Sequence, residues 1–274
     1  MSKRHAFVIA LGILGGAGCA PDGVEPLTWE QFQAQAYLEP DTGQYVVNGD
    51  ELAGDVIGLR AAYERYLDSV GDAADRAGGL GRSEEELIIN LAGGQWDRWT
   101  PAQAASITYC ISQSSFGSRY NAVVTAMNSA AGAWEGAARV NFVHASAQDG
   151  NCTRSTSGVV FNVRQVCSGQ YLARAFFPST ARRGRELLID CTSFGNISPW
   201  SLAGVLRHEL GHTIGFRHEH TRPESGVCFE DNQWAVLTTY DAASVMHYPQ
   251  CNGSNGGDLN LTTKDKQGAA IAYP

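Results

Sequence analysis

The stretch HELGHTIGFRHEH, residues 208–220, decides how this chain is interpreted. Its first five residues follow the pattern HExxH, with two histidines four positions apart. Positions i and i+4 share one face of a helix, so His208 and His212 can present two imidazoles to one metal ion. Gly215 can adopt the left-handed conformation that ends a helix and lets the chain return His218 as a third ligand. Three protein ligands leave one position open, as in a catalytic zinc site.

Glu209 supplies a carboxylate next to the expected metal. Zinc lowers the pKa of bound water to about 7. We expect Glu209 to take a proton from water as it attacks a peptide carbonyl, and to pass that proton to the leaving amine. With 7 histidines in 274 residues, a chance HExxH is expected in fewer than roughly one such chain in fifty. The pattern therefore predicts Zn²⁺ binding rather than three unrelated surface or core histidines.

The extended pattern HExxHxxGxxH resembles the signature of the metzincin zinc proteases. Its continuation, HEH at residues 218–220 with Arg222, is similar to the astacin family in particular. A second block, YD at residues 240–241 followed by SVMHY at residues 244–248, resembles the astacin Met-turn. Two blocks in the right order make the resemblance specific.

The resemblance covers roughly residues 96–274 and implies an α+β domain with a mixed twisted sheet, an active-site helix, a cleft and a small C-terminal subdomain. It implies that Met246 forms an apolar floor under the zinc and that Tyr248 stabilises the oxyanion. In the family an edge strand above the cleft pairs with extended substrate, a role we expect for residues 171–177. PES at residues 223–225 departs from animal astacins, which points to a divergent bacterial branch.

VNGD, residues 47–50, resembles a short motif of astacin pro-segments in which an aspartate binds the zinc in place of water. The resemblance implies that Asp50 closes the open metal position in the full-length chain. Asn48-Gly49 is also a hairpin-turn signal, and a plain turn explains both residues by itself. Inhibition by Asp50 and a simple turn therefore stand as alternatives.

Hydrophobic periodicity predicts the secondary structure along the chain. Helices are expected over residues 27–38, 55–70, 120–138 (with Ser118 as N-cap), 201–214 and 263–272 (with a capping box of Thr262 and Asp265). Strands are expected over residues 45–47, 106–112, 140–144, 158–163, 171–177 and 186–190. This mixed order, with an early and a late helix in the second part, indicates an α+β fold.

Three segments are expected: a signal peptide at residues 1–18, a pro-segment at residues 19–95 and a catalytic domain at residues 96–274. The first of them has two basic residues before a short apolar run, which is typical of an export signal. AGC at residues 17–19 resembles the lipobox of bacterial lipoproteins. The resemblance implies membrane attachment through a lipidated Cys19, with free secretion as the alternative.

The net charge and the cysteine count further limit the classes of function that this chain can have. The net charge of -8 repels phosphate backbones and argues against a nucleic-acid partner. Seven cysteines less Cys19 leave an even six, a set that exported proteins oxidise. Six cysteines allow fifteen pairings, of which Cys152–Cys167 and Cys228–Cys251 are the natural expectations because they are close in sequence.

These features favour an exported zinc endopeptidase that acts on polypeptides. One alternative is a catalytically silent surface protein that keeps the metal site for adhesion. Another is a zinc hydrolase of non-peptide substrates, because one fold hosts many reactions. Glu209 favours the enzyme, since a silent protein has no chemical need for it.

Overall fold

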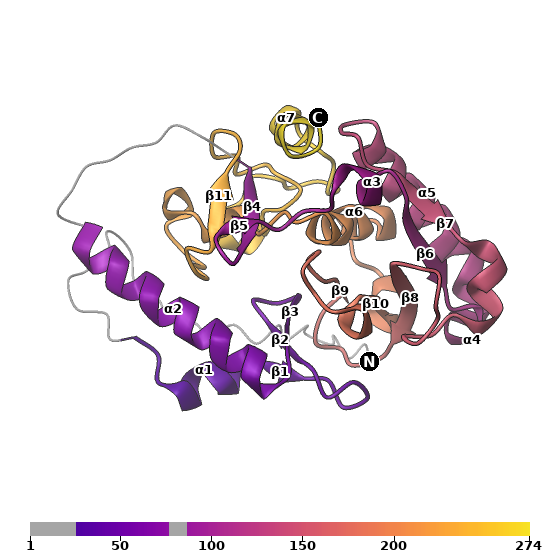
Figure 1. Ribbon diagram of the computed structural model, residues 1–274, viewed down its shortest axis with the longest axis horizontal. Helices are drawn as coiled ribbons and strands as arrows, with labels where there is room; N and C mark the ends of the chain where they lie inside the picture. Colours follow the sequence, from indigo (N-terminus) through magenta and orange to yellow (C-terminus); the bar gives the residue numbers. More distant parts are fainter. Residues whose placement is uncertain (1–25, 77–86) are drawn as a thin grey trace, which may run out of the picture.

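The computed structural model describes residues 26–76 and 87–274. The expected signal peptide, Cys19 and a glycine-rich connector expected at residues 77–82 lie outside the described residues. The segment before the connector forms a layer along one side of the larger body built from residues 87–274 (Figure 1). The two parts meet at the candidate site described below.

The N-terminal layer consists of two helices and a small antiparallel sheet. Its elements are α1 (Trp29–Gln35), β1 (Tyr37–Leu38), β2 (Tyr45–Val47), β3 (Glu51–Gly54) and α2 (Val56–Arg76), with strand order β1-β2-β3. A capping box made by Thr28 and Gln31 begins α1. The expected turn lies between β2 and β3, where Asn48 and Gly49 have φ of 56° and 96°.

A five-stranded mixed sheet forms the centre of the body. Its strands are β6 (Ile107–Ile111), β7 (Phe142–His144), β8 (Phe161–Val166), β9 (Ala173–Arg174) and β10 (Glu186–Asp190), in the order β7-β6-β8-β10-β9. Only the edge strand β9 is antiparallel to its neighbour. The expected strand over residues 171–177 is thus reduced to two paired residues. The mixed sheet with its helices confirms the α+β fold class.

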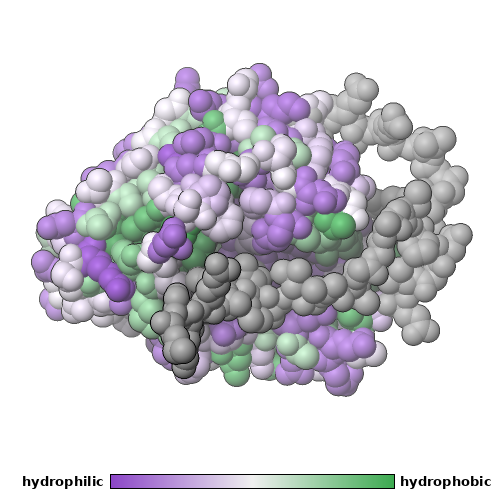
Figure 2. All heavy atoms as spheres, turned by 180° about the vertical axis from the view of Figure 1, so that it is seen from behind, coloured by the Kyte–Doolittle hydropathy of each residue, from purple (hydrophilic) through white to green (hydrophobic). Residues whose placement is uncertain are grey.

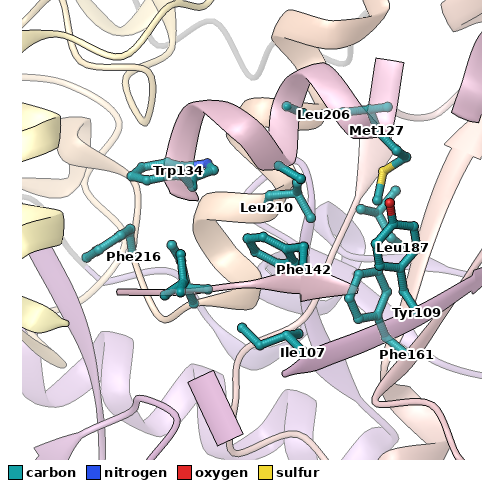
Figure 3. Packing of buried hydrophobic residues seen from close by; sticks show 14 of the residues in the cluster. Ile107, Tyr109, Met127, Trp134, Phe142, Phe161, Leu187, Leu206, Leu210 and Phe216 are labelled. Atoms are coloured by element: carbon teal, nitrogen blue, oxygen red, sulfur yellow. The ribbon is translucent and has the colours of Figure 1, made fainter. Parts of the chain in front are cut away.

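Helices pack on this sheet and enclose the core. They are α3 (Pro101–Ala104), α4 (Gln113–Phe116), α5 (Tyr120–Glu135), α6 (Leu202–Thr213) and α7 (Thr263–Ala272). Trp134 of α5 and Leu206 and Leu210 of α6 lie in one buried cluster with residues of the sheet (Figure 3). Large apolar side chains from both helices and the sheet therefore fix where α6 sits.

The observed N-caps of two helices can be compared with the predicted ones. The capping box of Thr262 and Asp265 is present at the start of α7. Ser118 is wrong as the N-cap of α5, because a short 3₁₀ turn (Gly117–Arg119) precedes this helix and Arg119 takes the cap position. Further 3₁₀ turns are Ser146–Asn151, Arg182–Gly184, Cys191–Phe194, Glu219–Thr221, Pro223–Ser225 and Pro249–Cys251.

A second small sheet pairs the residues just before the expected domain boundary with a strand near the C-terminus. It has the order β11-β4-β5, with β4 (Ile88–Ala92), β5 (Gln95–Trp96) and β11 (Trp234–Val236). The Asn90 amide of β4 donates to the Gly215 carbonyl, directly after α6. Residues on both sides of position 95 thus contribute to one sheet that supports the end of α6.

Hydrophilic side chains cover much of the face seen in Figure 2, with hydrophobic ones gathered in smaller areas between them. Within residues 26–76 and 87–274, no helix has the length and apolar character needed to cross a membrane.

In the part of the chain that the structure describes, two disulfides are formed. Cys228–Cys251 confirms one expected pairing. The other expectation, Cys152–Cys167, is wrong because Cys152 is bonded to Cys110 of β6, with Cα atoms 5.7 Å apart. The turn that follows β7 brings Cys152 beside β6, and this contact is not visible from spacing in the sequence.

We expect a third disulfide, between Cys167 and Cys191, in oxidised protein. These cysteines directly follow β8 and β10, whose last residues Val166 and Asp190 are register partners. Adjacent strands lie about 5 Å apart, which suits the Cα separation of a disulfide. Both cysteines are free thiols in this structure, and the neighbouring Cys167 raises the pKa of the Cys191 thiol to about 11.

Mass spectrometry of unreduced proteolytic fragments would detect the cross-linked peptides. Alkylation of both thiols in protein purified under oxidising conditions would contradict the expectation.

Candidate metal centre

Helix α6 carries all five HExxH residues, 208–212, into the interior. Ser201 caps its start by accepting from the Gly204 amide. The chain reverses at Gly215, whose φ is +98° and where an added Cβ would lie 2.2 Å from the Asp97 carbonyl oxygen. Only glycine suits this position. The reversal returns His218 toward the helix, as the sequence predicted.

The three predicted histidines converge with their Nε2 atoms. His208 Nε2 lies 3.2 Å from His212 Nε2 and 3.3 Å from His218 Nε2. Tetrahedral zinc with Zn–N distances near 2.0 Å requires nitrogens about 3.3 Å apart, so this trio fits a zinc ion. All three imidazoles are buried.

The other ring nitrogens of these histidines hold the Nε2 atoms in place. His208 Nδ1 lies 2.7 Å from the Val245 carbonyl oxygen, and His212 Nδ1 lies 2.8 Å from the Phe216 carbonyl oxygen. His218 Nδ1 lies 2.7 Å from Glu230 Oε1. Because each Nδ1 faces an acceptor, each Nε2 is left free to bind metal.

Glu209 lies beside the trio and is 2% exposed. Its Oε2 has no hydrogen-bond partner among the described residues. Burial, and next the nearby Asp50 carboxylate, raise the pKa of Glu209 well above its ordinary value. A buried carboxylate in this setting has a strong affinity for a proton, which suits a general base near a metal.

Met246 is fully buried directly under the helix. An added Cβ at Gly211 would lie 2.4 Å from the Met246 sulfur, so the methionine packs against the helix backbone between the two histidines of α6. The preceding Val245 carbonyl accepts from His208. The predicted Met-turn residues therefore lie where they support the histidine trio.

Asp50 of the N-terminal layer reaches into the same centre. Asp50 Oδ1 lies 3.0 Å from His218 Nε2 and Oδ2 lies 3.2 Å from His208 Nε2. Burial alone would raise the pKa of Asp50, but the charge of His218 and hydrogen bonds from the imidazoles hold it well below 3.8. Asp50 and the histidines together form a four-residue group that could hold a metal ion.

Tyr248 closes the centre from the side of the Met-turn. Its hydroxyl donates to Asp50 Oδ2 over 2.5 Å. Gly49 permits this approach, because an added Cβ would lie 2.9 Å from the tyrosine hydroxyl oxygen. The hairpin turn and the carboxylate at the histidines, which the sequence left as alternatives, are thus present together.

Buried ion pairs anchor the N-terminal layer on both sides of Asp50. Arg174 of β9 donates from Nε and Nη2 to the two carboxylate oxygens of Glu39, over 2.9 and 2.8 Å. Arg217 Nη2 lies 3.3 Å from Glu51 Oε2. Sequence reasoning missed these pairs, because partners more than a hundred residues apart leave no spacing signal.

Glu230 is a further residue that sequence reasoning missed. It comes from the chain between Cys228 and β11 and contacts His218, as described above. A glutamate in a stretch without periodicity has no pattern that marks it as part of a metal centre. Only its position within a short acidic pair, with Asp231, distinguishes it in the sequence.

A cavity of ≈170 Å³ opens beside His208 and Glu209. Its apolar walls include Leu172, Trp200, Val205 and Leu259. A cavity of about 150 Å³ with apolar walls is large enough to hold a benzene ring. The metal centre therefore adjoins space for one apolar side chain.

Comparison with known proteins finds a family model that matches the region of these residues. Residues 98–227 match the matrixin family of peptidases (Peptidase M10). Blastula protease 10 of Paracentrotus lividus is 33% identical over 81 residues, which is 23% of this chain and 14% of that protein. Tolloid-like protein 1 of Homo sapiens is 26% identical over 215 residues, which is 69% of this chain and 18% of that protein.

Among solved structures, myroilysin superposes with a TM-score of 0.47 at 16% identity, covering 68% of this chain and 98% of that chain. The chain spans less than a fifth of the length of the two curated relatives named above.

The matched region contains the three histidines and Glu209. Over this region the chain is similar to metzincin zinc proteases of the matrixin and astacin type, and its histidine cluster could hold a metal ion such as their Zn²⁺.

Proposed function

We propose that this chain is an exported endopeptidase that hydrolyses peptide bonds of extended polypeptides and is held latent by Asp50. One observation carries the proposal: in a trio of buried imidazoles, His208 Nε2 lies 3.2 and 3.3 Å from the other two Nε2 atoms, next to the buried carboxylate of Glu209. A surface protein that only bound metal would gain nothing from a buried carboxylate there, and burying it unpaired is costly.

His208, His212 and His218 would hold the zinc, which would supply Lewis acidity at the substrate carbonyl and would lower the pKa of bound water. Glu209 takes the proton of the attacking water and later gives it to the leaving amine. The Tyr248 hydroxyl, which donates to the Asp50 carboxylate in this structure, donates to the oxyanion once Asp50 has left.

The shape of the site supports a polypeptide substrate. Edge strand β9 pairs with β10 on one side only, and in this structure its two residues are buried, with Arg174 bound to Glu39 of the N-terminal layer. Once that layer has left, the free strand edge binds extended peptides through main-chain hydrogen bonds. The apolar cavity beside Glu209 receives one substrate side chain. The net charge of -8 disfavours nucleic acid.

The N-terminal layer supports latency. Asp50 takes the open position that the three histidines leave, and the buried pairs of Glu39 and Glu51 with arginines of the body hold it there. We place the end of the pro-segment before β4, because β4 pairs with β11 in the body. In this proposal the signal at residues 1–18 directs export, followed by lipid anchoring at Cys19 or by free release.

Removing the metal is expected to abolish cleavage. The intact chain and an Asp50→Ala chain would be stripped with a chelator, dialysed and assayed on casein, then assayed again after addition of one equivalent of Zn²⁺ per chain. We expect no cleavage by the stripped forms and recovery with zinc, because water at neutral pH is too weak a nucleophile without it. Metal-free protein that cleaves at the original rate would overturn the proposed function.

A further inference from the structure

The third histidine is held differently from the other two. His208 and His212 face backbone carbonyl oxygens, whereas His218 Nδ1 faces the carboxylate of Glu230 at 2.7 Å. A carboxylate is a stronger acceptor than a carbonyl oxygen, since hydrogen bonds to ionised groups are roughly twice as strong. His218 is also the ligand that lies outside helix α6, so no helix fixes its orientation.

Glu230 is itself fixed from several directions. Its Oε2 accepts from Arg217 Nη2 over 2.9 Å, and its Oε1 lies 3.2 Å from His220 Nε2. The side chain of Glu230 is 5% exposed. Asp231 holds the other arm of the same guanidinium, 2.5 Å from Arg217 Nη1. The carboxylate therefore has little freedom to turn away from His218.

The contact between Glu230 and His218 lies within the body. The N-terminal layer adds contacts from Glu51 to Arg217 and, at 3.8 Å, to His218 Nδ1, and from Arg65 to Asp231. Arg217, Glu230 and Asp231 themselves all belong to the body. When the layer leaves, Arg217 retains two carboxylate partners, and Glu230 keeps its contact with His218.

We propose that Glu230 is a positioning residue, which orients His218 and increases the electron donation of its Nε2 to zinc. Carboxylates that accept from a metal-bound histidine raise its basicity, and their loss typically lowers metal affinity 10- to 100-fold. The inference rests on the zinc site of the proposed function. Its test measures metal affinity alone, so a chain that binds zinc but cleaves nothing would contradict the proposed function and leave Glu230 testable.

The experiment titrates Zn²⁺ into the metal-free full chain against a chromophoric chelator. We expect Glu230→Ala to weaken zinc binding by about 10- to 100-fold. We expect Glu230→Gln to weaken it less, because the amide oxygen still accepts from His218 but carries no charge. The absorption bands of the Co²⁺-loaded protein should shift in both variants, because the ligand field that His218 supplies to the metal changes.

Asp231→Asn is the matched control. It weakens the same arginine network but removes no contact to His218, so its zinc affinity is expected to stay within about threefold of the parent. Equal affinity of Glu230→Ala and the parent would overturn the proposal. An equal loss in Asp231→Asn would also overturn it, since the effect would then arise from the network alone. If Glu230→Ala does not fold, as judged by circular dichroism, the isosteric Glu230→Gln decides.

Discussion

Glu209→Gln is expected to lower kcat/KM for peptide cleavage by about 10²- to 10⁴-fold, the range that general acid–base catalysis supplies. Glutamine keeps the size of the side chain but cannot accept the proton of the attacking water. Zinc binding should be retained, because the metal-binding nitrogens belong to His208, His212 and His218. The measurement compares cleavage of a fluorogenic peptide with zinc content, both in an Asp50→Ala background.

Glu224→Gln is the control for this change. Glu224 lies in the exposed turn after the site, and its replacement should leave cleavage within about twofold of the parent. A Glu209→Gln chain that retained zinc and cleaved nearly as fast as the parent would place the general base elsewhere.

The second large effect is expected at Asp50. Asp50→Ala should raise peptide cleavage by the full-length chain at least about tenfold, because a tethered carboxylate competes with water at a high effective concentration. The Asp50 carboxylate lies within 3.5 Å of all three Nε2 atoms and binds the Tyr248 hydroxyl. Initial rates of the intact chain and the variant at equal zinc content provide the measurement.

Asp68→Ala serves as the comparison within the same N-terminal layer. Asp68 is an exposed aspartate of α2, and removing it should change the rate by no more than about twofold. Equal rates for the intact chain, the Asp50 variant and a form proteolytically freed of the layer would show that Asp50 does not restrain the enzyme.

The metal centre could be predicted from sequence because its geometry is largely local. A helix places His208 and His212 on one face whatever the rest of the fold does, and a glycine after it allows the return of His218. The start of α7 was predictable for the same reason, since a capping box lies within four residues. Strand β10 was also found with the right bounds, because residues 187–189 form a short apolar run between two acidic residues.

The predictions that were wrong, and the contacts that were missed, depend on interactions between distant segments. Cys152 pairs with Cys110 because β6 and β7 are neighbours in the sheet, a fact of topology rather than spacing. Strand β9 is short because only two of its residues meet β10. The contact of Glu230 with His218 likewise depends on how the chain after α6 folds back. Hydrophobic periodicity is a local signal and does not indicate which distant segments pair.

The most direct test of the account is a crystal structure of the zinc-loaded full-length chain with anomalous diffraction recorded at the zinc edge. We expect one strong peak within about 2.0–2.2 Å of the Nε2 atoms of His208, His212 and His218 and of an Asp50 carboxylate oxygen. A zinc peak away from this trio, or a trio without zinc in protein that cleaves peptides, would contradict the account.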